Sequence, residues 1–316
     1  MFLPNSTETG LLRTISAVYG IWKYETDLCP KYAPITVLRT YVKDAVEAIN
    51  KEIDQLLRLK VGKIVSWQEI KKIEKYEIIG SFMFLKEKFK ADGSFDKMKA
   101  RLAALGNEEE ASLFTEDSSS PTANIMSILI LIAISVQYGC SLETDDVPGA
   151  YLHAPLPENR FIFLKLPNYV SKIWCEKEEL IYEQVKDGKN NVYIKLQKAL
   201  YGLKESGLLW FELFMKELQK LSYYPTPSDP CVLAKWRDGK FHFIAIYVDD
   251  MLHVSNDQNM ILDVRSYLER RFGSLGSQKG PKLSFLSINI EIIENQDVSK
   301  QLYQRGNVKM ERHLPH

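Results

Sequence analysis

The chain has 316 residues, of which 45% are hydrophobic and 26% charged, and its 41 Lys plus Arg balance 41 Asp plus Glu. This composition is too apolar for a disordered chain, and the length suffices for two or three packed units. Zero net charge excludes a uniformly basic nucleic-acid coat protein, although local basic patches remain compatible with it.

The four cysteines are widely spaced and form no Cys-x-x-Cys pair: Cys29, Cys140, Cys175 and Cys231. Their spacing argues against a zinc site or a disulfide framework, so we interpret them as small buried hydrophobic residues in a reducing compartment. Residues 1–9 lack the charged and apolar segments of a targeting signal. We therefore expect an intracellular protein, cytoplasmic or nuclear, with no membrane partner.

The N-terminal elements are predicted from the spacing of apolar residues. An amphipathic helix is expected over 41–60, where apolar residues recur at intervals of three and four. Strand-like alternation follows over 64–90. The segment 86–101 is rich in Lys and Arg and has Asp92-Gly93 at its centre, which predicts a basic hairpin.

The most apolar run, 125–136, has 12 residues, whereas a membrane span needs about 20. We expect a buried core helix there, with a start signal at 120–122 (Ser-Pro-Thr) and a stop at Gly139.

The C-terminal half mixes strands and helices without regular alternation, which favours an α+β fold with antiparallel pairing. The expected elements are a polar insertion over 171–191, a short strand over 192–196, helices over 207–221 and 261–272, a hydrophobic hairpin over 241–254, a strand-like run over 283–293 and a polar tail after 295.

Two adjacent carboxylates, Asp249 and Asp250, interrupt the hydrophobic hairpin. If the hairpin is buried, two like charges are held together at its tip, which is costly unless cations neutralise them. Carboxylate oxygens suit Mg²⁺, so a metal site is one interpretation. The alternative is that the pair caps a solvent-exposed turn.

A second acidic pair, Asp145 and Asp146, also follows an apolar run. Two-metal sites draw carboxylates from different strands, so Asp146 could join Asp249 and Asp250. The alternative is a helix N-cap with Pro148 near the first helical position.

Six motifs follow one another in a fixed order: Lys-Ala-Arg-Leu-Ala-Ala-Leu-Gly (99–106), Ser-Pro-Thr (120–122), Asp-x-x-x-Ala-Tyr-Leu (146–152), Lys-Ala-Leu-Tyr-Gly-Leu-Lys-Glu-Ser-Gly-Leu-Leu-Trp (198–210), Asp-Pro-Cys-Val (229–232) and Tyr-Val-Asp-Asp (247–250). Single motifs of this kind are weak, but their order is specific. Together they resemble the reverse transcriptase domain of copia-type (Ty/copia, Pseudoviridae) LTR retrotransposon Pol polyproteins, over roughly residues 67–303.

The resemblance implies a right-hand polymerase fold with fingers and palm, in which helices back an antiparallel palm sheet. We expect an N-terminal helical flanking region over 1–60, the reverse transcriptase domain over 61–305 and a tail over 306–316, with the thumb and connection regions truncated.

The resemblance also implies an RNA-directed DNA polymerase, which is a nucleotidyltransferase that extends a DNA or RNA primer on an RNA template with dNTPs. Asp146, Asp249 and Asp250 are the implied catalytic residues and ligands of two Mg²⁺, for which Mn²⁺ could substitute. Other Pol domains, RNase H and integrase, are expected partners absent from this chain. An intact element would place the protein in a virus-like particle.

Further site residues are implied by position in the motifs. Tyr151 would pack beneath the deoxyribose and exclude ribonucleotides, or else be a core aromatic of the palm. Lys99 and Arg101 would bind the triphosphate, or else form a solvated charged face.

The remaining implied contacts lie in two motifs. Tyr201 and Gly202 would contact the nucleotide, and Lys204, Tyr247 and Val248 the nucleic acid. Two other residues are interpreted structurally, Trp210 as core and His253 as an ordinary strand residue.

Three positions depart from the family pattern: Leu105 replaces an Arg, Glu205 a Gln and Ser287 a Gly. They leave open a truncated, catalytically inactive remnant that at most binds nucleic acid. A metal-dependent cyclase or nuclease on a similar palm is a third possibility, against which the 198–210 motif argues.

Overall fold

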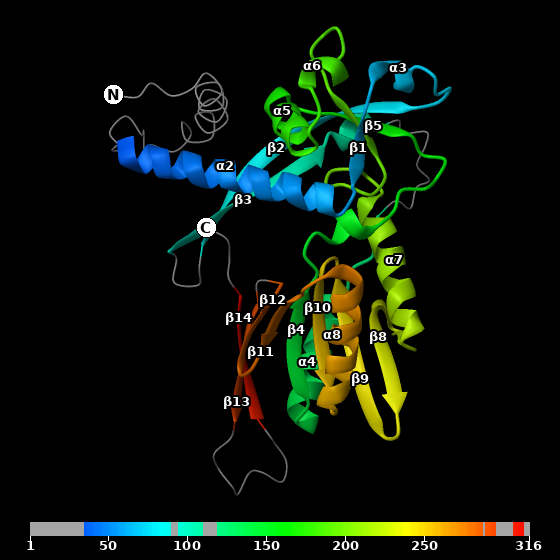
Figure 1. Ribbon diagram of the computed structural model, residues 1–316. Helices are drawn as coiled ribbons and strands as arrows, with labels where there is room; N and C mark the ends of the chain where they lie inside the picture. The colour runs from blue at the N-terminus through cyan, green and yellow to red at the C-terminus, as the bar shows by residue number, and fades with distance from the viewer. Residues whose placement is uncertain (1–34, 90–93, 110–118, 287, 295–305, 313–316) are drawn as a thin grey trace, which may run out of the picture. The chain divides into compact units, whose positions relative to one another are not determined.

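The computed structural model describes residues 35–89, 94–109, 119–286, 288–294 and 306–312, with side chains described outside 35–42 and 306–312 (Figure 1). The chain divides into two compact units. Unit 1 comprises residues 1–111 and 156–203, and unit 2 comprises residues 112–155 and 204–316. The mixture of helices with mainly antiparallel sheets confirms the α+β class. The helices that the structure describes include none with the length and apolarity of a membrane span.

Unit 1 is built on a five-stranded sheet in the order β1-β6-β5-β2-β3, in which β2 and β5 are parallel and the other pairs antiparallel. Its strands are β1 (Gly62–Val65), β2 (Glu77–Phe89), β3 (Phe95–Ala104), β5 (Ile162–Lys165) and β6 (Tyr193–Leu196). Its helices are α2 (Ile35–Arg58), α3 (Trp67–Ile70), the 3₁₀ helix η2 (Gly106–Glu108), α5 (Asn168–Lys177) and α6 (Tyr182–Val185).

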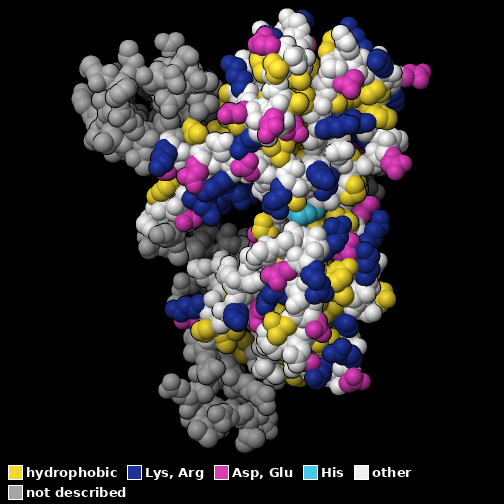
Figure 2. Space-filling view, in the orientation of Figure 1, with side chains coloured by type: hydrophobic (Ala, Val, Ile, Leu, Met, Phe, Trp, Pro, Cys, Tyr) yellow, Lys and Arg dark blue, Asp and Glu magenta, His cyan; other side chains and the backbone are white. Residues whose placement is uncertain are grey.

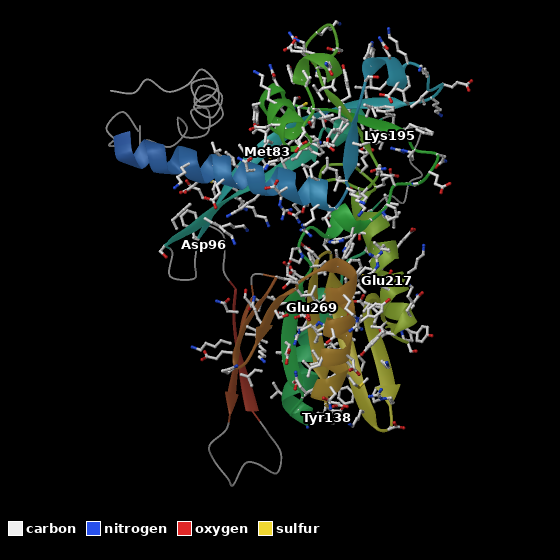
Figure 3. The ribbon with its side chains drawn as sticks, viewed as in Figure 1. Met83, Asp96, Tyr138, Lys195, Glu217 and Glu269 are labelled. Carbon is white, nitrogen blue, oxygen red and sulfur yellow. The ribbon has the colours of Figure 1, made fainter. Side chains whose placement is uncertain are left out.

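The predicted basic hairpin is confirmed by the pairing of β2 with β3, which runs from Ser81 opposite Ala104 to Phe89 opposite Phe95. The turn signal at 92–93 lies outside the described residues. Figure 3 labels Met83 on β2 and Asp96 on β3.

Helix α2 packs on the edge strand β3. Its Glu52 carboxylate accepts the N–H of Leu102 at 3.1 Å, so a backbone donor at the sheet edge is satisfied by a side chain.

Unit 2 contains a six-stranded antiparallel sheet in the order β11-β4-β10-β9-β8-β7 and a separate three-stranded sheet, β12-β13-β14. The first consists of β4 (Ser141–Asp146), β7 (Tyr224–Thr226), β8 (Asp229–Arg237), β9 (Lys240–Tyr247), β10 (Asp250–Ser255) and β11 (Gly276–Lys279). The second consists of β12 (Lys282–Phe285), β13 (Ile288–Glu294) and β14 (Gly306–Arg312). The helices are α4 (Ile125–Tyr138), the 3₁₀ helix η4 (Ala150–His153), α7 (Ser206–Lys220) and α8 (Gln258–Phe272).

The six-stranded sheet is covered on both faces. Leu142, Leu252 and Val254 point to one face and join Ile128 and Ile132 of α4 in a hydrophobic cluster. Figure 1 shows α4 behind these strands and α8 in front of them. Since β-strand side chains alternate, neighbouring residues of β4 and β10 are delivered to opposite layers.

Helix α4 corrects one prediction in part. It begins after Asn124, whose side chain accepts the N–H of Met126, rather than at 120–122. It ends at Gly139 in the left-handed conformation, as predicted. The helix is buried along one stripe only, because Met126 and Ile130 are 60% and 55% exposed. The apolar sequence of this helix therefore did not mean that every face of the helix is buried.

Two other regions contain more structure than the sequence pattern predicts. The polar insertion over 171–191 includes most of α5 and all of α6, and the polar tail includes the strand β14. Both were missed because their stabilising contacts, such as the pairing of β14 with β13, are made with residues outside the segment itself.

A close backbone contact in unit 1 depends on a glycine. The N–H of Ala104 donates to the carbonyl of Tyr201 at 2.8 Å, which brings residue 202 directly against β3. Gly202 has a φ of +91°, and a Cβ added there would lie 2.2 Å from the Ala104 carbonyl oxygen. No side chain fits without backbone movement.

Gly202→Ala should therefore lower the free energy of unfolding by at least about 2 kcal/mol, because left-handed strain and overpacking act together. Urea unfolding of the full chain measures this. The matched control is Gly188→Ala, where an added Cβ meets nothing within 4 Å, and it should change stability by less than about 0.5 kcal/mol. Equal stability of the two variants would contradict this account of the contact.

Candidate active site

The acidic pair of the hydrophobic hairpin lies at a two-residue turn between β9 and β10. Tyr247 is paired with Asp250, so Val248 and Asp249 form the loop. Val248 has a φ of +58° and Asp249 has no positive φ, which is the pattern of a type II′ turn. This conformation is costly for a β-branched residue. The indole N–H of Trp210 donates to the Val248 carbonyl at 2.7 Å, which helps to hold the turn from helix α7.

Asp146 lies directly opposite Asp250 on the neighbouring strand β4. The N–H of Val147 donates to the carbonyl of Asp249 at 3.0 Å, so these two residues form a hydrogen-bonded pair. The next pair, Asp146 with Asp250, is therefore of the non-hydrogen-bonded kind, in which the Cα atoms are about 4.5 Å apart and the side chains are closest. The fold places two carboxylates side by side.

The electrostatic consequence is visible at Asp250. Its burial, together with the charges of Asp249 and Asp146, raises its pKa to about 6. A carboxylate normally ionises near pH 4, so holding all three groups ionised at neutral pH is costly unless a cation is present.

The side of Asp146 away from Asp250 is flanked by a glycine. Gly276 of β11 pairs with Asp146, and a Cβ added at residue 276 would lie 3.5 Å from the Asp146 Oδ2 atom. An added Cβ would be in ordinary van der Waals contact with the carboxylate, so residue 276 lies directly beside it.

The chemistry of these side chains suits the binding of a hard divalent cation. The donor set consists of oxygens, and the repulsion at Asp250 is what a cation would relieve. Within the part of the chain that the structure describes, no three His, Cys, Asp or Glu side chains form a ready-made metal site. Mg²⁺ is usually held by one or two carboxylates and completed by substrate phosphates, so a preformed cage is not required.

The structure excludes one of the two structural alternatives for the acidic pairs. Asp145 and Asp146 belong to strand β4 and do not cap a helix. Asp249 does lie in the hairpin turn, as the other alternative expected, but Asp249 and Asp250 are both partly buried, and Asp250 is the first residue of β10. Asp145 points to the opposite face from Asp146 and binds Arg265 of α8.

The other site residues predicted in unit 2 lie at three places. Tyr151 is on η4, five residues after Asp146, and is partly buried. Lys204 is exposed just before α7. Tyr247, at the end of β9, is 37% exposed, and Val248 occupies the turn already described.

The site residues predicted in unit 1 are partly brought together. The guanidinium of Arg101 stacks over the ring of Tyr201 at 4.3 Å, and Gly202 follows that ring. Lys99 lies two residues from Arg101 on the same face of β3 and is exposed.

That face of the β2–β3 hairpin is strongly basic. Its cross-strand pairs include Lys86 with Lys99 and Lys88 with Lys97, and like charges directly opposite one another are destabilising. Phe82 and Phe84 lie on the same face and are 45% and 37% exposed. In the described parts of the two strands, the face holds no acidic residue. Cations and aromatic rings are thus arranged along one surface.

This basic face is a local feature. Elsewhere, on the side of the molecule visible in Figure 2, Lys and Arg side chains alternate with Asp and Glu. Zero net charge therefore coexists with a patch of one sign, as the composition allowed.

The interpretation of Trp210 as core is confirmed, since it is 1% exposed and stacks on Phe214. His253 lies in strand β10 as predicted, but it is fully buried and contacts Asp145 and His242. The sequence did not reveal that the Trp210 indole also donates a hydrogen bond to the turn. Nor did it reveal that Arg265 bonds Asp145 of β4, or that His242 of β9 contacts His253 of β10. Arg265 is 120 residues from Asp145, so no local pattern could have paired them.

The described cysteines agree with the hydrophobic interpretation. Cys175 and Cys231 are buried, Cys140 is partly exposed, and all three are free thiols. Cys29 lies outside the described residues.

The comparison with protein families matches residues 65–308 to a family described as reverse transcriptase (RNA-dependent DNA polymerase). This match covers most of the chain and includes both acidic pairs. The chain belongs to this family, as a reverse transcriptase domain of the copia type found in retrotransposon Pol polyproteins.

Three relatives illustrate the likeness. The chain is 30% identical over 206 residues to the retrovirus-related Pol polyprotein from transposon TNT 1-94 of Nicotiana tabacum. The aligned region covers 64% of this chain and 14% of that protein. It is 26% identical to the Pol polyprotein from transposon RE1 of Arabidopsis thaliana, over 62% of this chain and 12% of the relative. It is 25% identical to the Ty1-LR2 Gag-Pol polyprotein of Saccharomyces cerevisiae, over 83% of this chain and 13% of the relative.

The raised pKa of Asp250 predicts how stability depends on pH. A carboxyl group with a raised pKa binds its proton more tightly in the folded state than in the unfolded chain, where the pKa is near 3.8. Its contribution therefore favours folding at about pH 4 and is lost as the pH rises through about 6.

In buffer without divalent ions, Asp250→Asn should be more stable than the native chain at pH 7.5, and this advantage should vanish near pH 4. Urea midpoints at both pH values measure it, with Asp263→Asn on the exposed surface of α8 as the control. A native chain more stable than Asp250→Asn at pH 7.5 would show that the carboxylates do not repel one another as described.

Proposed function

We propose that this chain is the polymerising part of an RNA-directed DNA polymerase, which extends a DNA or RNA primer on an RNA template by two-metal nucleotidyl transfer. One observation carries the proposal: Asp146 and Asp250 are directly opposite one another on adjacent strands, beside Asp249 in a tight turn. Membership of the reverse transcriptase family supports it.

The two units suit the palm and fingers of a right-hand polymerase. Unit 2, with an antiparallel sheet between α4 and α8, has the features expected of a palm. Unit 1, with its basic β2–β3 hairpin, has those expected of fingers.

The chemistry assigned to the site follows from its three carboxylates. Two Mg²⁺ held by Asp146, Asp249 and Asp250 would activate the primer 3′-hydroxyl and stabilise the leaving pyrophosphate. The chain's own contribution is to hold the carboxylates in fixed directions before substrate arrives. The paired strands fix Asp146 and Asp250, and the bond from Trp210 helps to fix the turn that carries Asp249.

Substrate contacts are assigned to both units. Lys99 and Arg101 would bind the triphosphate of a dNTP, with Tyr201 supporting the Arg101 guanidinium by stacking and Gly202 allowing close approach. Tyr151 would lie beneath the deoxyribose and reject a 2′-hydroxyl.

The template strand would use the basic face of the β2–β3 hairpin. Phe82 and Phe84 offer exposed rings on which bases can stack, and Lys86 and Lys88 follow them along the strand. Lys204, Tyr247 and Val248 are assigned to the nucleic acid in unit 2. The like-charged pairs on the hairpin face would be relieved by phosphates.

A nucleic-acid-binding remnant without catalysis is the second candidate. The departures Leu105 and Glu205 are compatible with it, but the carboxylates of the proposed centre are all present. Activity decides between the two.

Primer extension on an RNA template, with the purified full chain and Mg²⁺ or Mn²⁺, tests the proposed reaction. Asp249→Asn and Asp250→Asn should each lower the rate at least about 10³-fold, because a metal ligand at the reacting centre is lost. Asp263→Asn should extend the primer at the native rate. Absence of extension by native, folded protein would support the binding-only remnant instead.

Lys86→Gln/Lys88→Gln should weaken binding of single-stranded RNA and reduce the salt dependence. The slope of log affinity against log salt should fall by about 1.4, since two phosphate contacts on a single strand are removed. Fluorescence anisotropy measures both quantities. Lys72→Gln/Lys75→Gln, which removes two exposed cations elsewhere in unit 1, serves as the control. An unchanged slope in the first variant would remove the hairpin face from the template path.

A further inference from the structure

Strand β4 carries carboxylates to both faces of its sheet. Asp146 points to the same face as Leu142, whereas Glu143 and Asp145 point towards α8. Asp145 is 1% exposed and Glu143 4% exposed, so two acidic side chains are buried beside the proposed catalytic one.

Hydrophobic patterning does little to fix the register of this strand. The sequence of β4 is Ser-Leu-Glu-Thr-Asp-Asp, in which Leu142 is the single apolar residue. A slip of one residue would exchange the faces of Asp145 and Asp146, and the hydrophobic core would lose only the placement of Leu142. Because residues 145 and 146 are both aspartates, a slipped strand would still present an aspartate on each of the two faces.

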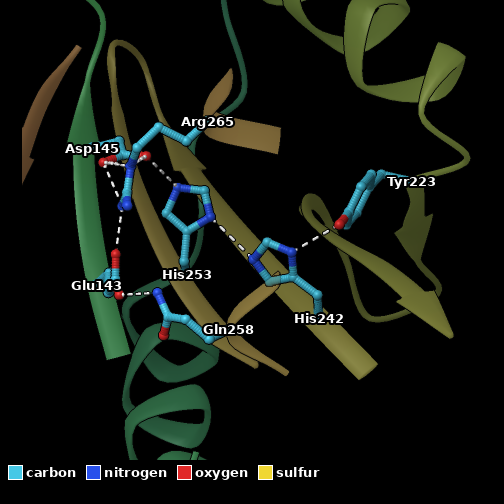
Figure 4. Close-up of polar contacts among 7 residues, drawn as sticks. All are labelled: Glu143, Asp145, Tyr223, His242, His253, Gln258 and Arg265. Carbon is cyan, nitrogen blue, oxygen red and sulfur yellow. Dashed lines mark hydrogen bonds and ion pairs between the residues drawn. The ribbon is translucent and has the colours of Figure 1, made fainter. Parts of the chain in front are cut away.

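Arg265 of α8 distinguishes the two registers. Its Nε donates to both oxygens of Asp145 at 3.1 Å, and its Nη2 donates to Glu143 at 2.6 Å (Figure 4). Gln258 also donates to Glu143, at 2.6 Å. In a strand slipped by one residue, Thr144 and Asp146 would face α8. Arg265 would then meet one carboxylate instead of two.

The same contacts tie β4 to the neighbouring strands. Asp145 lies 3.2 Å from the Nε2 of His253 on β10. The His253 Nδ1 contacts the His242 Nε2 on β9 at 3.0 Å, and the His242 Nδ1 contacts the hydroxyl of Tyr223 at 2.8 Å (Figure 4).

One arrangement of protons accounts for the two hydrogen bonds of this chain. Tyr223 donates to His242 and His242 donates to His253, whose Nε2 lies 3.2 Å from Asp145 without hydrogen-bond geometry. Burial and the adjacent His253 lower the pKa of His242, which agrees with a neutral ring. Asp145 is thus bonded from α8 and contacted from the adjacent strand.

We propose that Arg265 and Asp145 are positioning residues that fix the register of β4, so that Asp146 faces Asp250 and Asp145 does not. The functional meaning of this inference rests on the proposed polymerase site. Buried ion clusters seldom add net stability compared with apolar side chains of similar size, and fixing a register is their best-attested use. The cluster is therefore expected to matter for the site more than for stability.

The test replaces the cluster by uncharged side chains, in Glu143→Thr/Asp145→Thr/Arg265→Met, so that no buried charge is left without a partner and β4 gains no alternating apolar pattern that would fix its register. The control is Glu217→Leu/Arg271→Leu, which removes the ion pair between the buried Glu217 of α7, labelled in Figure 3, and the exposed Arg271 of α8. Both variants should unfold within a few degrees of the native chain.

Register is read by disulfide trapping in the full chain, without reference to activity. Thr144→Cys and Leu252→Cys are directly opposite in the native register, at a non-hydrogen-bonded pair suited to a disulfide. A cross-link between Thr144→Cys and Met251→Cys detects a strand slipped by one residue, because Met251 is opposite Asp145 in the native register. Peptide mapping identifies each cross-link.

In the cluster variant, the 144–252 cross-link should fall at least fivefold and the 144–251 cross-link should appear. Its kcat should fall at least tenfold with little change in the KM for dNTP. In the control variant, both cross-links and kcat should match the native chain. Native yields of the 144–252 cross-link in the cluster variant would overturn the inference.

Arg265→Lys keeps the test decisive if the cluster variant does not fold. An ammonium group cannot bridge both carboxylates as the guanidinium does, so the 144–252 yield should fall at least twofold. A native yield in a folded Arg265→Lys chain would overturn the inference. Failure of native protein to extend a primer would instead reject the proposed function, and the cross-linking result would still stand on its own.

Discussion

The arrangement of this protein's proposed site depends on one electrostatic constraint, the placing of Asp146 and Asp250 side by side on adjacent strands. The pair is unfavourable by itself, as the raised pKa of Asp250 indicates. A sheet would normally avoid it, since like charges directly opposite one another oppose strand pairing. Unit 2 keeps the pair because strong contacts elsewhere determine the strand positions.

Those contacts come from both layers around the sheet. The cluster between α4 and the strands supplies hydrophobic burial, while Arg265 anchors β4 from α8 through polar groups. Trp210 adds a bond to the Val248 carbonyl, in a turn whose conformation is otherwise costly. Strain and repulsion are thus concentrated at the proposed reacting centre, and well-packed residues nearby offset them.

The sequence predicted local features well. The two hairpins, the helices α7 and α8 and the acidic turn were all visible in alternation, spacing and turn residues, and ordered motifs indicated the family. It could not predict that α4 is buried on one side only, that β14 forms in a polar tail, or that Asp145 pairs with Arg265. Each of these depends on contacts made outside the segment itself, and partners 120 residues apart, such as Asp145 and Arg265, have no local signature.

The central claim is that the carboxylate pair is completed by a divalent cation. The most direct measurement is the unfolding temperature of the full chain at pH 7.5 as Mg²⁺ is added, beside that of Asp146→Asn. Mg²⁺ should raise the unfolding temperature of the native chain progressively, because an ion that binds only the folded state stabilises it by mass action, and should raise that of the variant far less. An absent shift, or an equal shift in both proteins, would contradict the account.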